Sequence, residues 1–106
     1  MFTAEDEAQC MAALDRWMDA VNAHDADAME REMRFPHARL AKRQLAIYEK
    51  PGSNPMDLFA RLAKESGWAY SRWDSRKVVH TLPGTAHLAV AYTRYRADHS
   101  IIARYD

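Results

Sequence analysis

The chain has 106 residues with 15 basic and 15 acidic side chains, so its formal charge at neutral pH is zero. Apolar residues make up 48% of the sequence and charged residues 28%, which is typical of a folded globular domain and excludes a disordered chain. This length predicts one domain, residues 1–106, with a core of its own. Since no apolar run approaches the roughly 20 residues of a membrane-spanning helix, we expect no membrane partner.

The start of the chain and its cysteine content bear on location. Residues 1–7 are acidic where a secretory signal would be basic and then apolar. Cys10 is the single cysteine, so no internal disulfide can form. Both features predict a cytoplasmic protein.

The charges are unevenly distributed along the chain. Residues 1–30 hold eight acids and one base, Arg16, so the remainder is basic. Its Lys and Arg residues come singly or in short groups such as Arg76-Lys77, without a dense basic tract or the aromatic motif of RNA-binding domains. We therefore expect an acidic helical face beside a basic sheet, and no nucleic-acid partner.

Two helices are predicted at the start of the chain. Thr3 and Asp6 match a capping box with aspartate in place of glutamate. Apolar residues then recur at helical spacing and predict an amphipathic helix of about five turns: Cys10, Leu14, Trp17, Met18 and Val21. Asp25 can cap a second helix that continues to about Met33.

The middle of the chain predicts a strand pair and a third helix. Residues 37–49 follow Phe35-Pro36 and are interpreted as two short strands with a turn near 41–43, although part of this stretch also suits a helix. Asn54 as N-cap, with Pro55 and Asp57 after it, predicts the start of the third helix, and Gly67 predicts its end.

From Trp68 onward, β-branched and aromatic residues predict an antiparallel meander. Strands are expected at 68–82, with a bulge near 74–77, at 87–97 and at 100–105. The resulting order, ααββαβββ, predicts an α+β fold.

This order of elements resembles the nuclear transport factor 2-like superfamily, which includes ketosteroid isomerase and the SnoaL-like polyketide cyclases. The segment Arg16-Trp17-Met18-Asp19-Ala20-Val21-Asn22-Ala23-His24-Asp25 is similar to the family's first-helix signature, an apolar helix ending in Asn-x-x-Asp. Asn54-Pro55 and Gly67-Trp68 match the family's third helix in placement. The resemblance implies a cone, in which a curved antiparallel sheet wraps around the helices and leaves an apolar pocket at its open end.

The sequence departs from this family in two respects. Trp17 stands where ketosteroid isomerase has its oxyanion-stabilising tyrosine, and the position of the aspartate base falls near Ala41, so steroid-isomerase chemistry is not implied. The family also ends with one more strand. We therefore expect a truncated chain, strand exchange in a dimer, or an incomplete gene product.

His37, at the start of the first predicted strand, is the candidate catalytic residue because imidazole can act as acid or base near neutral pH. A structural hydrogen-bonding role is the alternative. His80 and His87 are weaker candidates, each of which could form a His/Asp pair with Asp74, and the strand register between them is unknown. The five histidines show no metal-binding spacing, and three isolated glycines form no phosphate-binding loop, so we expect no metal and no cofactor.

Aromatic side chains form the candidate ligand-binding set, since a ring beside a cavity offers an apolar face and, in Tyr or Trp, one polar atom. The set is Trp17, Phe35, Tyr48, Phe59, Trp68, Tyr70 and Tyr92. One hypothesis is a domain that binds a small apolar molecule, with SnoaL-like isomerase, cyclase or dehydratase activity. The other is a non-catalytic interaction or assembly module. In either case Ala89, Ala91 and Thr93 share a sheet face suited to a homodimer.

Overall fold

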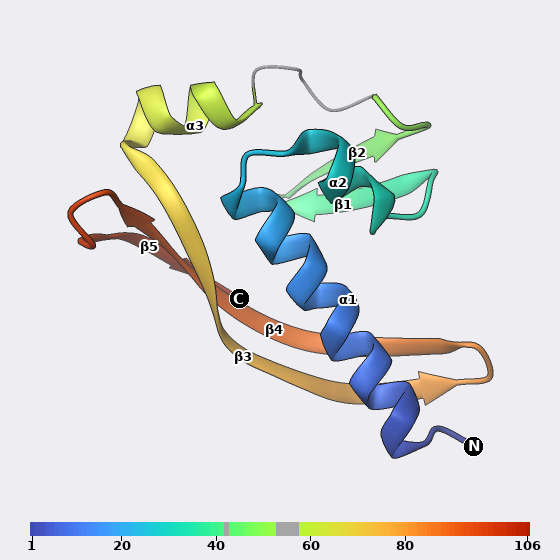
Figure 1. Cartoon of the computed structure of the whole chain (residues 1–106). Coiled ribbons are helices and arrows are strands. Elements are labelled where there is room, and N and C mark those ends of the chain that lie inside the picture. The colour runs from blue at the N-terminus through green and yellow to red at the C-terminus, as the bar shows by residue number, and fades with distance from the viewer. Residues whose placement is uncertain (42, 53–57) are drawn as a thin grey trace.

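The computed structural model describes residues 1–41, 43–52 and 58–106 (Figure 1). Its elements follow the predicted order: α1 (Ala4–Asn22), α2 (Ala26–Arg31), β1 (His37–Ala41), β2 (Gln44–Tyr48), α3 (Leu58–Ser66), β3 (Trp68–Leu82), β4 (Thr85–Arg96) and β5 (Ile101–Tyr105). The α+β class is thereby confirmed. The predicted cap of α3 at Asn54, Pro55 and Asp57 lies outside the described residues. Within these ranges, no helix is both long and apolar enough to cross a membrane.

Side-chain caps start the first two helices as predicted. The Thr3 hydroxyl accepts a hydrogen bond from the Asp6 N–H at 3.1 Å, and the Asp6 carboxylate accepts one from the Thr3 N–H at 2.9 Å. The Asp25 carboxylate likewise accepts from the N–H of Ala28 at the start of α2. This helix ends at Arg31, earlier than the predicted Met33, because its last backbone bonds join residues three apart and tighten the final turn.

The described strands form two separate antiparallel sheets. β1 and β2 make a two-stranded hairpin, while β4 lies between β3 and β5 in a three-stranded sheet. The predicted bulge in β3 is present as a register shift between Trp73 and Ser75. These two sheets close no barrel within the described ranges, so the cone remains a prediction.

Helix α1 lies across one face of β3 and β4 (Figure 1). Arg76, which is paired with Val90, reaches α1 and donates a hydrogen bond to the Asp15 carboxylate at 2.6 Å. Val90 therefore lies on the α1 side of the sheet. By strand alternation, Ala89 and Thr93 lie on the opposite face.

The hydrophobic core is concentrated where the C-terminal half of α1 meets α2, α3 and the start of β3. Its buried hydrophobic residues are Met18, Ala20, Val21, Met29, Phe59 and Trp68. The chain exposes 7880 Å² of accessible surface, whereas a compact monomer of 12.2 kDa exposes about 6,100 Å². Its radius of gyration is 14.7 Å, against about 13 Å for a compact domain of this length. The fold thus leaves an unusually large surface uncovered.

Candidate functional site

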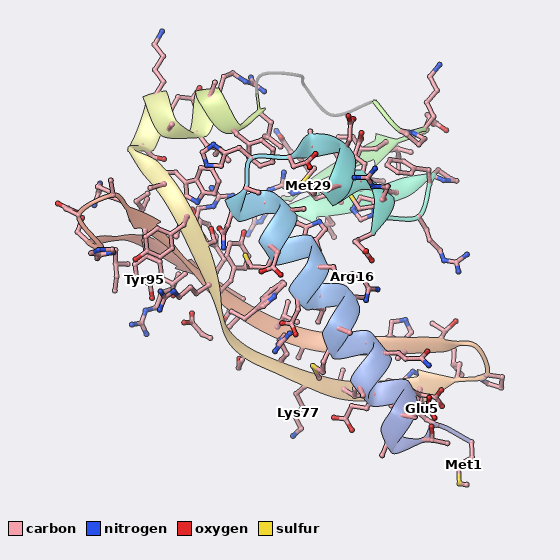
Figure 2. The ribbon with its side chains drawn as sticks, in the orientation of Figure 1. Met1, Glu5, Arg16, Met29, Lys77 and Tyr95 are labelled. Atoms are coloured by element: carbon pink, nitrogen blue, oxygen red, sulfur yellow. The ribbon has the colours of Figure 1, made fainter. Side chains whose placement is uncertain are left out.

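A groove of about 660 Å³ runs between the first turns of α1 and the loop that joins β3 to β4. Phe2, Asp6 and Cys10 line it on the helix side, and Thr81 and Ala86 line it on the sheet side. Figure 2 marks this end of α1 by Met1 and Glu5. The walls of the groove are a helix and a hairpin tip. Its volume is large enough for a small ligand.

The titratable groups of the groove suit binding better than acid–base catalysis. Asp6 is held by Thr3 in the helix cap, and these hydrogen bonds, first that from the backbone N–H, lower the pKa of its carboxyl below the ordinary value. Asp6 therefore stays ionised near neutral pH and is already engaged in holding α1 together. Arg34 and the half-buried Cys10 also line the groove. Among the described lining residues, no carboxyl–histidine pair exists to move a proton.

His37 lies away from this groove, at the start of β1. It is half-buried, and its ring stacks on that of Tyr48, the residue opposite it in β2, with 6.0 Å between ring centroids. It lines neither the groove nor the smaller hollow of about 250 Å³ on the hairpin. The His37 ring thus packs on Tyr48, and both the catalytic role and the structural hydrogen-bonding role stay predictions.

The seven candidate ligand-binding aromatics do not surround one cavity. They divide among separate ring contacts: Trp17 with Trp73, Phe59 with Trp68, Tyr48 with His37, Tyr70 with Tyr95, and Tyr92 with Tyr105, while Phe35 is half-buried before β1. None of them lines the groove. Between α3 and the start of β3, the rings of Phe59 and Trp68 pack on one another.

The Asn-x-x-Asp segment at the end of α1 has structural contacts. The Asn22 side chain donates to the Ser71 carbonyl at 2.9 Å and accepts from the Ser71 N–H at 2.8 Å, which fastens α1 to β3. The Ser71 hydroxyl in turn accepts a hydrogen bond from the buried Trp68 indole N–H at 2.9 Å. Since Asp25 caps α2, both polar residues of the segment satisfy backbone groups.

Asp74 and the two histidines His80 and His87 are not brought together. The Asp74 carboxylate accepts a hydrogen bond from the Thr93 hydroxyl at 2.5 Å. His80 lies six residues further along β3, about 20 Å away in an extended strand. It faces His87 instead, across the β3–β4 hairpin. A His/Asp base is therefore absent at this place, and sequence reasoning missed the direct pairing of the two histidines.

The β1–β2 hairpin carries an exposed apolar surface that the sequence analysis also missed. Leu40 lies opposite Leu45, and Ala38 lies opposite Ile47, so strand alternation puts all four on one side, here called the hairpin face. The exposed fractions are 75% for Leu40, 65% for Leu45 and 48% for Ile47. The regular spacing of these residues in two adjacent strands was a signal that could have revealed this surface.

The described residues contain no group of three or more His, Cys, Asp or Glu side chains that could hold a metal ion. Comparisons of the chain with protein-family models, curated proteins and solved structures found no match.

Proposed function

We propose that this chain is a non-catalytic interaction module that associates with a second copy of itself through the hairpin face. The observation that carries the proposal is the exposure of Leu40, Leu45 and Ile47 together on one side of β1–β2. This hairpin has few contacts with the rest of the described chain. An isolated two-stranded hairpin is marginally stable in water, and burying its apolar side is the usual way to stabilise it.

The energy available from this face is substantial. Complete burial of a Leu or Ile side chain contributes about 1.5 to 3 kcal/mol. Since 48% to 75% of their surface is still exposed, burying the rest of these three side chains would contribute about 0.7 to 2.3 kcal/mol each. Docking two hairpin faces against one another would supply this energy from both copies.

The size and charge of the chain favour a second copy as the partner. The accessible surface exceeds that of a compact monomer by about 1,800 Å², and a stable interface buries about 800 Å² on each partner. Over the whole chain, the excess surface is therefore larger than one partner's share of such an interface. The formal charge of zero means that two copies approach without long-range repulsion.

The open face of the main sheet is a poorer surface for such a dimer. Strand register puts Arg72, Lys77 and Arg104 on the face away from α1, and Figure 2 shows Lys77 extending from β3 away from that helix. The Asp74 carboxylate on the same face is already bonded to Thr93. Two copies of this face would bring like charges together, which opposes association.

Two matched substitutions distinguish these surfaces in sedimentation equilibrium or light scattering. Ile47 and Ile101 are exposed strand residues with exposed fractions of 48% and 47%. Ile47→Lys places a charge in the proposed contact and should weaken the dimer at least about tenfold, because an unpaired buried charge is costly. Ile101→Lys should leave association at the parent level.

A parent chain that stays monomeric at micromolar concentration would overturn the proposal. So would a dimer that Ile47→Lys leaves intact, or one that only Ile101→Lys disrupts, since the latter would put the interface on the main sheet. Circular dichroism of both variants checks that the strands remain folded.

Ligand binding with SnoaL-like chemistry in a nuclear transport factor 2-like cone is the second candidate function. The groove of about 660 Å³ and the order ααββαβββ favour it. A thermal-shift screen of small hydrophobic metabolites tests it, with His37→Ala and the groove-filling Cys10→Phe as variants. Absence of a stabilising ligand would refute the binding role, and equal stabilisation of the parent and His37→Ala would exclude a His37-centred site.

A further inference from the structure

His80 and His87 form an exposed pair across the β3–β4 hairpin. Pro83 and Gly84 form the two-residue connection at its tip, and the register leading away from them puts the two histidines directly opposite one another. The His80 and His87 Nδ1 atoms lie 3.3 Å apart, and the ring centroids lie 5.4 Å apart. Two basic nitrogens with lone pairs thus face each other at the surface.

We propose that this pair chelates one divalent transition-metal ion, such as Zn²⁺, Ni²⁺ or Cu²⁺, through the two Nδ1 atoms. Imidazole nitrogen binds these metals, and a Zn–N bond measures about 2.0 to 2.1 Å. Two such nitrogens in tetrahedral coordination lie about 3.3 to 3.4 Å apart. The observed separation of 3.3 Å between the two Nδ1 atoms matches this requirement. Strand pairing puts the two residues opposite one another, and their exposed side chains place the two Nδ1 atoms at this spacing.

Proton placement follows from the coordination. Without metal, a hydrogen bond between the two Nδ1 atoms needs the N–H on one ring and the lone pair on the other. With metal, both neutral rings carry their N–H on Nε2, and both Nδ1 lone pairs bind the ion. Neutral rings exchange tautomers through water, so this step releases no net proton. Protonated rings cannot bind, and acid should therefore release the metal.

The surroundings of the histidine pair should let a bound metal ion exchange readily. Lys77 lies on the same sheet face, opposite Ala89, and is the charged group nearest along that face by register. No third His, Cys, Asp or Glu joins His80 and His87 among the residues that the structure describes. Of the described residues, this pair supplies two ligands, and the remaining coordination positions take water or another ligand. This differs from a closed structural zinc site, which uses four protein ligands.

Isothermal titration of the full chain with Ni²⁺, Zn²⁺ or Cu²⁺ alone tests the site, in a Cys10→Ser background that removes the thiol. We expect one ion per chain and the affinity order Cu²⁺ above Ni²⁺. His80→Thr and His87→Thr should each weaken binding by at least about tenfold, since even the loss of an outer-shell partner weakens metal sites by 10 to 100-fold. Thr suits an exposed strand position, so the hairpin should keep its fold.

His99→Asn is the matched control. His99 is also exposed, and its φ of 70° is one that Asn accepts, so this change removes a histidine without touching the pair. It should leave the affinity unchanged. In the Cu²⁺ complex, electron paramagnetic resonance should show nitrogen coupling that disappears in the His80→Thr and His87→Thr double variant.

Two results would overturn the proposal. The first is an absence of binding by the parent, and the second is equal affinity of the parent and the double variant. The site lies on β3–β4, so each of these outcomes is independent of association through the hairpin face.

Discussion

Phe59→Ala tests the packing that holds α3 in the core. Phe59 is the buried residue of this helix, with 8% of its surface exposed. Its ring centroid lies 5.9 Å from that of Trp68 and 5.4 Å from that of His24. Truncation removes both ring contacts and leaves a cavity between α3 and β3.

We expect this substitution to lower the free energy of unfolding by about 4 kcal/mol. A buried Phe side chain removes roughly 150 to 200 Å² from water, which corresponds to about 4 to 5 kcal/mol at about 25 cal/mol per Å². The residual methyl group reduces this figure, whereas the cavity raises it, and Phe→Ala changes in cores typically cost about 3 to 5 kcal/mol. Since small domains have only about 5 to 15 kcal/mol in total, the loss is a large share.

Urea unfolding at one fixed protein concentration, followed by tryptophan fluorescence, measures the change. Val79→Thr is the control, because Val79 is 57% exposed and Thr keeps the β-branched shape, and it should change stability by less than about 0.5 kcal/mol. A loss below about 1 kcal/mol for Phe59→Ala would contradict this prediction, since α3 would then not depend on this contact.

Substitutions at three further positions test local features of the fold. Ser71→Ala removes the acceptor of the buried Trp68 indole N–H and should cost about 1 to 3 kcal/mol in urea unfolding; no loss would show that the indole finds another partner. Gly67→Ala puts a side chain at a φ of 73° and should cost about 1 kcal/mol, whereas Gly67→Asn should cost less. Thr3→Ala removes the hydroxyl of the cap but keeps the backbone N–H, which is the main donor lowering the pKa of the Asp6 carboxyl from 3.8 in the folded chain. The part of the stabilisation that the hydroxyl contributes is present above about that pH and is lost as pH falls through the lower folded value. The melting temperature of Thr3→Ala should therefore fall most at neutral pH, and a larger fall in acid would contradict this assignment.

Local signals in the sequence predicted the elements well. Thr3 and Asp25 satisfy free N–H groups at helix starts, so their positions mark the beginnings of α1 and α2. Gly67 has a positive φ just after α3, as a helix-ending glycine requires. These features depend on neighbours within a few residues, and sequence patterns record such neighbours directly.

The candidate site was less predictable because it depends on which surfaces meet. Alternation in β4 shows that the strand has two faces, but only the packing of α1 decides which one is covered. The predicted ligand-binding aromatics have the chemistry for a pocket, yet Phe59 and Trp68 pack on each other in the core. Composition gives the number of aromatic rings and says nothing of their partners.

The histidine pair and the hairpin face each have one property that the sequence determines and another that only the tertiary structure determines. A two-residue turn at Pro83-Gly84 suffices to put His80 opposite His87, because register counts outward from the turn, while the distance of 3.3 Å between the Nδ1 atoms comes from the folded strands. The spacing of Leu40, Leu45 and Ile47 likewise determines that they share a face. Only the tertiary structure decides that nothing in the described chain covers that face, since burial is a property of contacts between elements far apart in the sequence.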